Sequence, residues 1–282
     1  MSAAVITAAL TGPIATKQDN PNLPTSPEEI ALAAASAHAA GAAVVHVHLR
    51  DKSGAPTADL QIARRVVGLI EEACPALIQL STGVGLSVSF EDRQRLIEAR
   101  PRMASLNPCS MSFGAGEFRN PPDGVRRLAG RMRELGIKPE LEIYDTGHLE
   151  VCMQLVAEGL VAEPLSFSIV MGVRGGMPAT PAALVELVGR LPPGAIWQAI
   201  AIGRANLPMT AIGLAMEGNA RTGMEDTLMV RRGVPAPSNA ELVRRLVDVA
   251  RALDRDAADP VEVERMLDLR PVRAASSDSK PV

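Results

Sequence analysis

The sequence predicts an α/β fold, a single-domain (β/α)8 TIM barrel, and three observations support this prediction. Apolar runs typical of buried strands alternate with amphipathic stretches typical of helices. The alternation continues through the 282 residues without a linker-like break. Strict strand–helix alternation implies a parallel sheet, and about eight such units at this length favour a closed barrel. We expect the barrel to span residues 1–272.

The expected strands are apolar runs followed by loops rich in glycine, proline or polar residues. In chain order they are residues 4–10, 43–49, 77–81, 103–107, 140–144, 165–171, 196–202 and 219–223. The expected helices are residues 27–41, 60–73, 90–99, 123–135, 148–157, 181–191 and 207–216, and a long helix after Ser238. Ser26-Pro27 and Thr180-Pro181 are typical helix starts, because a hydroxyl caps the first turn and proline is tolerated at the first helical position.

An open doubly wound sheet is the alternative fold. The glycines after the first strand form no G-x-G-x-x-G pattern, and Gly83 and Gly85 after the third strand are isolated, so a dinucleotide-binding sheet is disfavoured. The last residues, 273–282, are small and polar. We expect this tail to be disordered or to contact a neighbouring subunit.

The composition excludes several function classes. Net charge is −3 and aromatic residues are only 2% of the chain, so neither a basic stripe nor base-stacking side chains indicate a nucleic-acid partner. No apolar run approaches the length of a membrane span. The N-terminus lacks the basic segment of a signal peptide, and the cysteines, at wide spacings, are typical of reduced thiols. We expect a soluble, cytoplasmic protein without a membrane partner.

His46 and His48 are the most informative residues of the chain. They lie in the apolar run 43–50, which predicts a buried strand. Side chains two residues apart on a strand point to the same face, so both imidazoles should project together. Two neutral imidazoles from one rigid strand make half of a transition-metal site. The alternative is a pair of hydrogen-bonded core histidines.

Polar residues at the other strand ends should gather at the same mouth, because the active site of a (β/α)8 barrel lies at the C-terminal ends of its strands. These candidates are Thr11, Arg50, Ser81, Thr82, Ser105, Asn107, Glu142, Tyr144, Asp145, Arg221, Glu225 and Asp226. The last and first strands close the ring, so Glu225 can reach the histidines of the second strand. His46, His48 and Glu225 would then form a two-histidine, one-carboxylate metal site with open positions.

Each of these residues also has a structural interpretation. Glu142 can be part of a buried ion pair with a barrel arginine, and Arg221 can form a structural salt bridge with Asp226. Arg50 can pair with Asp51 or Glu225, and Ser81 and Ser105 can cap the following helices. His38 and Cys109 are expected to be packing residues, and His148 has no evident partner.

The chain resembles a known family, the beta-keto acid cleavage enzymes, which include 3-keto-5-aminohexanoate cleavage enzyme. The resemblance runs through nearly the whole chain. The matching segments are Ile-Thr-Ala-Ala-Leu-Thr-Gly at 6–12, Pro-Asn-Leu-Pro at 21–24, His-Val-His-Leu-Arg at 46–50, Ser-Thr-Gly at 81–83, residues 140–144, Gly-Gly-Met at 175–177, Arg221 with Glu225-Asp226, and Ser-Asn-Ala at 238–240. Their order and spacing together make the resemblance specific.

The resemblance implies a zinc-binding barrel, usually a homotetramer, that exchanges acyl groups between a beta-keto acid and acetyl-CoA, giving acetoacetate and a new acyl-CoA. The alternative to zinc is another divalent transition metal. Its ligands would be His46, His48 and Glu225. The base would be Asp226, positioned by Arg221. The resemblance places substrate-binding hydroxyls at Ser81 and Ser105, with Thr82 and Asn107 beside them, and a further pocket carboxylate at Glu142.

Two positions depart from the aminohexanoate-cleaving relative. Ile14 stands where that relative has a glutamate that meets the substrate ammonium, so we expect a keto acid with an apolar or uncharged tail. Arg174 replaces a proline and could meet a phosphate of CoA. The rival hypotheses are cleavage of the amino substrate itself, a metal-dependent aldolase or hydrolase on the same barrel, and a non-catalytic metabolite-binding protein.

Overall fold

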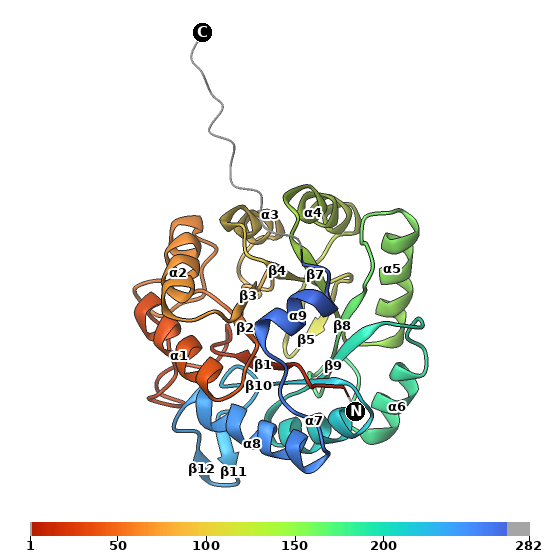
Figure 1. Ribbon diagram of the computed structural model, residues 1–282. Coiled ribbons are helices and arrows are strands. Elements are labelled where there is room, and N and C mark those ends of the chain that lie inside the picture. The colour runs from red at the N-terminus through yellow and green to blue at the C-terminus, as the bar shows by residue number, and fades with distance from the viewer. Residues whose placement is uncertain (1, 270–282) are drawn as a thin grey trace.

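The computed structural model describes residues 2–269 and confirms the barrel (Figure 1). Eight parallel strands form a closed ring in the order β1-β10-β9-β8-β7-β4-β3-β2, and β2 pairs with β1 to complete it. Their bounds are β1 Ile6–Ala9, β2 Val44–Val47, β3 Leu77–Leu80, β4 Met103–Leu106, β7 Lys138–Ile143, β8 Ser166–Met171, β9 Ile196–Ala201 and β10 Asn219–Thr222. The tail expected at residues 273–282 lies outside the described residues.

Helices surround the ring, as Figure 1 shows. Their bounds are α1 Pro27–Ala39, α2 Leu60–Ala73, α3 Phe90–Gln94, α4 Pro122–Leu135, α5 Thr146–Ala157, α6 Pro181–Val188, α7 Asn206–Ala215, α8 Asn239–Ala252 and α9 Pro260–Met266. Two short 3-10 helices, η1 Arg95–Ala99 and η2 Gly203–Ala205, adjoin α3 and α7. Aliphatic side chains between strands and helices form the core, which compensates for the scarcity of aromatic residues.

The helix starts follow the expected capping chemistry. Ser26 and Glu29 form a capping box at the start of α1, because each side chain bonds the other residue's backbone N–H. The expected helix 90–99 is instead α3 followed by η1. The η1 segment ends at Arg100, which takes a left-handed conformation before Pro101, and a residue before proline avoids the right-handed helical region.

Besides the short η2, two hairpins and one helix of the described chain were absent from the sequence prediction. The hairpins lie in loops after strands and are formed by β5 Met111–Phe113 with β6 Gly116–Phe118 and by β11 Met229–Arg231 with β12 Val234–Pro235. The helix is α9, which with the following residue packs the buried Val263 and Leu267 against Val44 and Met103 at the N-terminal ends of the strands. Figure 1 shows α9 in front of the ring. One end of the barrel is therefore closed.

Within residues 2–269, no helix is both long enough and apolar enough to cross a lipid bilayer.

Candidate active site

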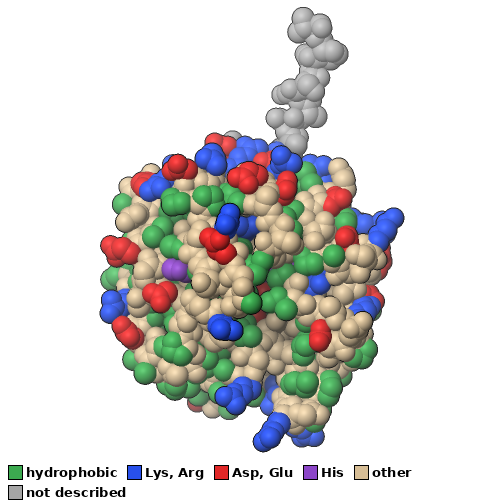
Figure 2. All heavy atoms as spheres, turned by 180° about the vertical axis from the view of Figure 1, so that it is seen from behind, with side chains coloured by type: hydrophobic (Ala, Val, Ile, Leu, Met, Phe, Trp, Pro, Cys, Tyr) green, Lys and Arg blue, Asp and Glu red, His purple; other side chains and the backbone are tan. Residues whose placement is uncertain are grey.

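The opposite end of the barrel opens into a cavity of about 750 Å³. Figure 2 shows this face, which is hollowed near its centre and has hydrophobic side chains around the hollow. The cavity is lined by residues from the C-terminal ends of the strands and the loops after them, including His48, Ser81, Asn107, Glu142, Arg221, Glu225 and Asp226. A second cavity, of about 20 Å³ near the closed end, is too small for a substrate.

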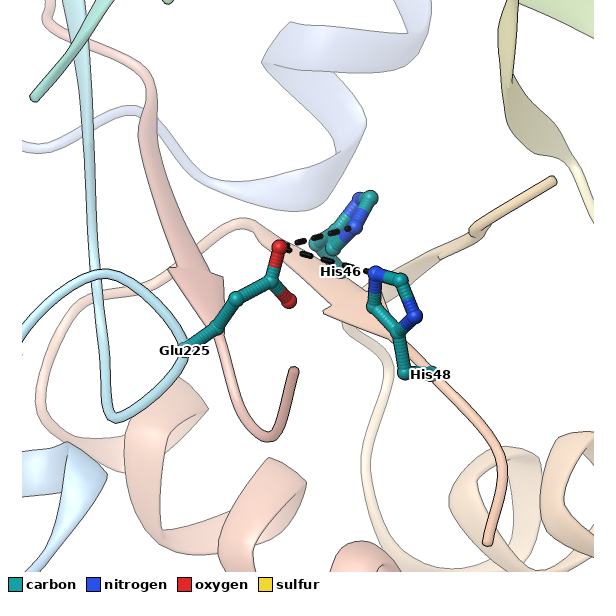
Figure 3. A group of neighbouring side chains, drawn as sticks. All are labelled: His46, His48 and Glu225. Atoms are coloured by element: carbon teal, nitrogen blue, oxygen red, sulfur yellow. Dashed lines mark ion pairs between the residues drawn. The ribbon is translucent and has the colours of Figure 1, made fainter. Parts of the chain in front are cut away.

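His46, His48 and Glu225 converge at the floor of this cavity (Figure 3). His46 lies on β2 and His48 one residue beyond its end, and Glu225 follows β10. Because β1 pairs with both β10 and β2, the two ends of the ring meet here. Glu225 Oε1 lies 3.6 Å from His46 Nε2 and 3.5 Å from His48 Nε2.

The three residues fit a divalent transition metal. Gln79 Oε1 lies 2.6 Å from His46 Nδ1; an amide oxygen only accepts, so Nδ1 carries the proton and Nε2 presents its lone pair to the cluster. Burial lowers the pKa of His46 to about 3, which keeps the ring neutral. Among the described residues, Glu225 Oε2 is buried without a hydrogen-bond partner. Three protein ligands leave an open position, as in catalytic zinc sites.

Gly12 is required for this arrangement. A Cβ atom at position 12 would lie 2.7 Å from Cγ of Glu225, closer than van der Waals contact allows. The loop after β1 can therefore pass beside Glu225 only because residue 12 has no side chain.

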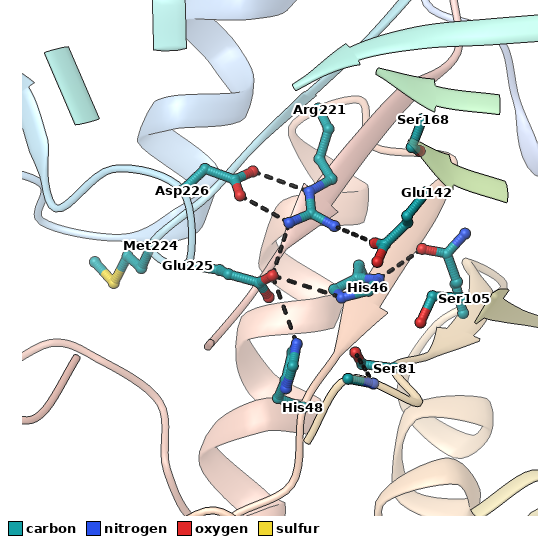
Figure 4. Close-up of polar contacts among 12 residues, drawn as sticks. His46, His48, Ser81, Ser105, Glu142, Ser168, Arg221, Met224, Glu225 and Asp226 are labelled. Atoms are coloured by element: carbon teal, nitrogen blue, oxygen red, sulfur yellow. Dashed lines mark hydrogen bonds and ion pairs between the residues drawn. The ribbon is translucent and has the colours of Figure 1, made fainter. Parts of the chain in front are cut away.

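Arg221 connects the acids of the site (Figure 4). Its guanidinium donates two hydrogen bonds to Asp226, at 3.0 and 2.7 Å, and one to Glu225 Oε1 at 2.7 Å. Its Nη1 lies 3.6 Å from Glu142 Oε1. The predicted salt bridge with Asp226 is thus present. Three buried carboxylates face a single guanidinium, an excess of negative charge that a bound cation would balance.

Burial and charge shift the pKa values of these acids in different directions. Burial raises the pKa of Glu142 to about 7 and that of Asp226 to about 6, although Arg221 counteracts it in both cases. Burial also disfavours the charged form of Glu225, but Arg221 and the histidines outweigh it and hold the pKa of that carboxyl below its usual range. Glu225 is therefore ionised, as a metal ligand must be.

The polar residues at the C-terminal ends of β3 and β4 divide into two groups. Ser81 and Asn107 line the cavity, and both atoms of the Asn107 amide are buried without a hydrogen-bond partner among the described residues. Ser105 and Thr82 bond each other instead: Thr82 N–H donates to Ser105 Oγ, and Thr82 Oγ1 donates to the Ser105 carbonyl. The residues found to cap α3 and α4 are Ser89 and Pro121 rather than Ser81 and Ser105.

Ile14 lines the outer part of the cavity, and its side chain is 74% exposed. The loop that carries it is held by Arg50, which donates hydrogen bonds to the carbonyls of Gly12 and Ala15. Arg50 also donates to Gly54 O, so it binds backbone carbonyls rather than the expected partners Asp51 or Glu225. Sequence reasoning missed this role, and it missed Gln79, although Gln79 precedes Ser81 by two positions.

Tyr144 also lines the cavity, whereas His148, Cys109 and His38 do not. His148 accepts a hydrogen bond from the backbone N–H of Tyr144 through Nδ1, and burial lowers its pKa. Burial raises the pKa of the half-buried Cys109 thiol, which is unfavourable for a nucleophile. His38 Nδ1 lies 3.0 Å from the Ala42 carbonyl beside α1.

Known proteins resemble the chain over almost its whole length. A family model described as beta-keto acid cleavage enzyme matches residues 3–269. A 3-keto-5-aminohexanoate cleavage enzyme of Acetoanaerobium sticklandii is 39% identical over 95% of this chain and 98% of its own. A 3-oxoadipate:acetyl-CoA acetyltransferase of Cupriavidus necator is 34% identical over 94% of each.

A solved structure shares the fold. The apo structure of ObcA superposes with a TM-score of 0.77 at 21% identity and covers 88% of this chain. The chain spans 66% of the length of that protein. At this identity the likeness concerns the fold alone.

Proposed function

The chain belongs to the beta-keto acid cleavage enzyme family, and on this basis we propose that it exchanges acyl groups between a beta-keto acid with an apolar or uncharged tail and acetyl-CoA. The products would be acetoacetate and a new acyl-CoA. The observation that carries the proposal is the buried group of His46, His48 and Glu225 beside the Arg221–Asp226 pair at the cavity floor.

We propose His46, His48 and Glu225 as ligands of zinc or another divalent metal, which when bound would act as a Lewis acid toward the oxygens of the keto acid. Asp226 is the proposed base. Its two hydrogen bonds from Arg221 fix its orientation, and a pKa of about 6 leaves it ionised at neutral pH and able to accept a proton.

Asp226 would take a proton from the carbon between the keto and carboxylate groups. The resulting carbon nucleophile attacks the acetyl carbonyl of acetyl-CoA, a new carbon–carbon bond forms, and CoA leaves as its thiolate. The thiolate then attacks the original ketone, and the bond between that ketone carbon and the central carbon breaks. Asp226 returns its proton to the central carbon, so acetoacetate and the new acyl-CoA leave without net change at the enzyme.

Polar groups beside the proposed metal ligands can donate hydrogen bonds to the substrate carboxylate. Ser81 and the Asn107 amide line the cavity, and Arg221 Nη1 is buried without a hydrogen-bond partner among residues 2–269. We propose these groups as direct contacts. Ser105 and Thr82, which bond each other, would hold the loop that presents Ser81, and Glu142 would keep Arg221 in place.

The outer cavity supports an apolar or uncharged tail. Its wall includes Ile14, Pro56, Leu86, Phe113, Val173 and Ile202. The carboxylates that line the cavity, Glu142, Glu225 and Asp226, all lie within 4.0 Å of Arg221. A cationic tail would therefore find no separate carboxylate in the outer cavity of the described chain.

Dependence on acetyl-CoA tests the proposed reaction. Purified protein is incubated with beta-keto acids of different tail charge, with and without acetyl-CoA, and acetoacetate is measured. We expect turnover only with acetyl-CoA and fastest with uncharged tails. Equal loss of keto acid without a thioester would instead indicate a lyase or aldolase, and binding without turnover a non-catalytic protein. Homotetramer formation and a cytoplasmic location stay predictions, which light scattering and cell fractionation can test.

A further inference from the structure

One cation at the cavity mouth, Arg174, has no acidic partner among residues 2–269. Arg174 lines the cavity and is exposed. Its guanidinium forms no ion pair or hydrogen bond with any described residue, whereas Arg221, the other arginine of the lining, is paired with all three lining carboxylates. The three carboxylates inside the cavity are therefore held at Arg221, and none of them contacts Arg174, which is left for an anion that comes from solution.

A second arginine occupies the equivalent place in the neighbouring loop. In the parallel pairing of β8 and β9, Met171 lies beside Ala201, and the Ile202 N–H donates to the Met171 carbonyl at 3.1 Å. Arg174 and Arg204 each follow these paired residues by three positions. Arg204 is also exposed and forms no ion pair within the described chain. Arg174 and Arg204, neither of which forms an ion pair within residues 2–269, thus lie on adjacent loops after β8 and β9.

The backbone that presents Arg174 is firmly held. The Arg174 carbonyl accepts a hydrogen bond from the Gly114 N–H at 2.9 Å, and the Met177 N–H donates to the Tyr144 carbonyl at 2.8 Å. Gly175 has a φ of +105°, and a Cβ there would lie 2.1 Å from the Ser112 carbonyl oxygen. This close contact joins the Arg174 loop to the β5–β6 hairpin, so the arginine extends from an ordered edge of the cavity.

We infer that Arg174, with Arg204 on the neighbouring loop as a second contact, binds the phosphate groups of CoA at the cavity mouth while the acetyl thioester reaches inward toward Asp226. The inference rests on the proposed function. Guanidinium groups bind phosphate through paired N–H donors, and CoA carries its phosphates far from its thioester along a flexible arm. The exposed rim of the cavity, where Arg174 lies, suits the nucleotide end of CoA, because that end stays in solvent. Figure 2 shows basic side chains beside the hollow.

The keto acid's own carboxylate is the competing ligand for Arg174. That group has to lie next to the reacting carbon, where the buried Asn107 amide and Arg221 Nη1 have no hydrogen-bond partner among the described residues. A distal carboxylate on a longer keto acid would have to reach the exposed rim. The position of Arg174 therefore favours the phosphates.

The test compares acetyl-CoA with the acetyl thioester of N-acetylcysteamine, which has the same reactive group but no phosphate. For Arg174→Gln we expect kcat/KM for acetyl-CoA to fall about tenfold, through KM, with a further loss when Arg204→Gln is added. The effect should shrink as salt rises. The KM of the keto acid and the activity with the truncated thioester should not change. Arg265→Gln serves as the matched control, because Arg265 on α9, at the closed end of the barrel, is exposed and forms no ion pair within residues 2–269.

Equal losses with both thioesters, or a higher KM for the keto acid alone, would overturn the inference. Binding of adenosine 3′,5′-bisphosphate, measured by calorimetry, keeps the inference separate from the proposed reaction. If the wild type binds this probe and Arg174→Gln weakens it about tenfold, the phosphate site holds even if no turnover is found. If the wild type turns over acetyl-CoA but neither variant changes its KM or the binding of the probe, the reaction stands and the phosphate site is wrong.

Discussion

Two glutamates on β7, two residues apart, have very different surroundings. Glu140 lies toward the closed half of the barrel, where Ser168 and Gln198 donate hydrogen bonds to its two carboxylate oxygens. Glu142 is on the same face of the strand, one layer nearer the mouth. It lies 3.6 Å from Arg221, and burial raises its pKa to about 7. The same residue type is thus part of a hydrogen-bonded core in one layer and of the cavity wall in the next.

The comparison extends to the two layers as a whole. Near the mouth, several polar atoms are buried without partners among the described residues: His48 Nδ1, both atoms of the Asn107 amide, Arg221 Nη1 and Glu225 Oε2. Each such atom costs about 1–3 kcal/mol if nothing pairs with it. Unpaired groups concentrated beside a cavity indicate that ligands complete them, whereas both oxygens of the Glu140 carboxylate already accept hydrogen bonds from protein side chains. We call the layer of Glu142 and Arg221, at the cavity, the upper layer, and the layer of Glu140, Ser168 and Gln198 the lower layer. Substitutions in the upper layer should therefore affect turnover, and substitutions in the lower layer should affect stability.

Replacing the proposed base should have the largest effect. Asp226→Asn keeps the size of the side chain but removes the proton acceptor, so we expect kcat to fall about a thousandfold. Metal content, measured by elemental analysis, and the thermal midpoint should stay close to those of the wild type. Turnover that survives in this variant would remove Asp226 as the base and weaken the assignment of the upper layer to chemistry.

Removing a proposed metal ligand, or the group that orients one, should affect metal affinity in a graded way. We expect His48→Ala to abolish zinc retention during dialysis. Gln79→Leu, which removes the partner of His46 Nδ1, should weaken zinc affinity about 10- to 100-fold. Competition with a chromophoric chelator measures both. His38→Ala, beyond the cavity on α1, is the control, and equal zinc loss in it would contradict a specific site.

Changing the lower layer should affect stability alone. Glu140→Leu leaves the Gln198 amide and the Ser168 hydroxyl without their carboxylate partner, and we expect the free energy of unfolding to fall by about 1–3 kcal/mol. Denaturant titration measures this change, while kcat at a temperature where the variant is folded should be unchanged. A large drop in kcat with little loss of stability would show that the two layers are not separate in function.

The smallest effect is expected at the edge of the cavity. Ile14→Glu adds a carboxylate to the outer wall, and we expect the ratio of kcat/KM for a cationic keto acid over an uncharged one to rise about threefold to tenfold. The gain is limited because Ile14 is 74% exposed and solvent screens the new charge. Ile14→Gln, of the same shape without the charge, is the matched control. The same ratio in both variants would exclude position 14 as a determinant of substrate charge.

The barrel and the convergence of the cluster residues could be predicted from sequence because each depends on regular patterns. Strand–helix alternation determines the ring, and the two-residue period of a strand brings His46 and His48 together. Glu225 follows from closure, since the last strand must meet the first. The roles predicted for Asp226, Ser81 and Asn107 stay predictions, although the structure places all three at the cavity.

What the sequence did not predict depends on contacts between distant segments. Arg50 binds three backbone carbonyls, and no pattern marks those acceptors in advance. Gln79 lies in an apolar strand, and nothing in the sequence indicates that its side-chain oxygen contacts His46 on the neighbouring strand. The hairpins β5–β6 and β11–β12 have strands of only two or three residues, too short for a period to be recognised. Helix α9 packs on strand ends that only the assembled barrel provides.

The seam between β1 and β10 has a consequence for how the protein matures. The two histidines lie in the first fifth of the chain and Glu225 in its last quarter, and their ligand atoms meet only after β10 pairs with β1. During synthesis, the three-residue cluster cannot assemble until β10 and Glu225 have emerged from the ribosome. In refolding from denaturant, the uptake of zinc should therefore follow the closure of the ring, and its rate would give the time of that last step.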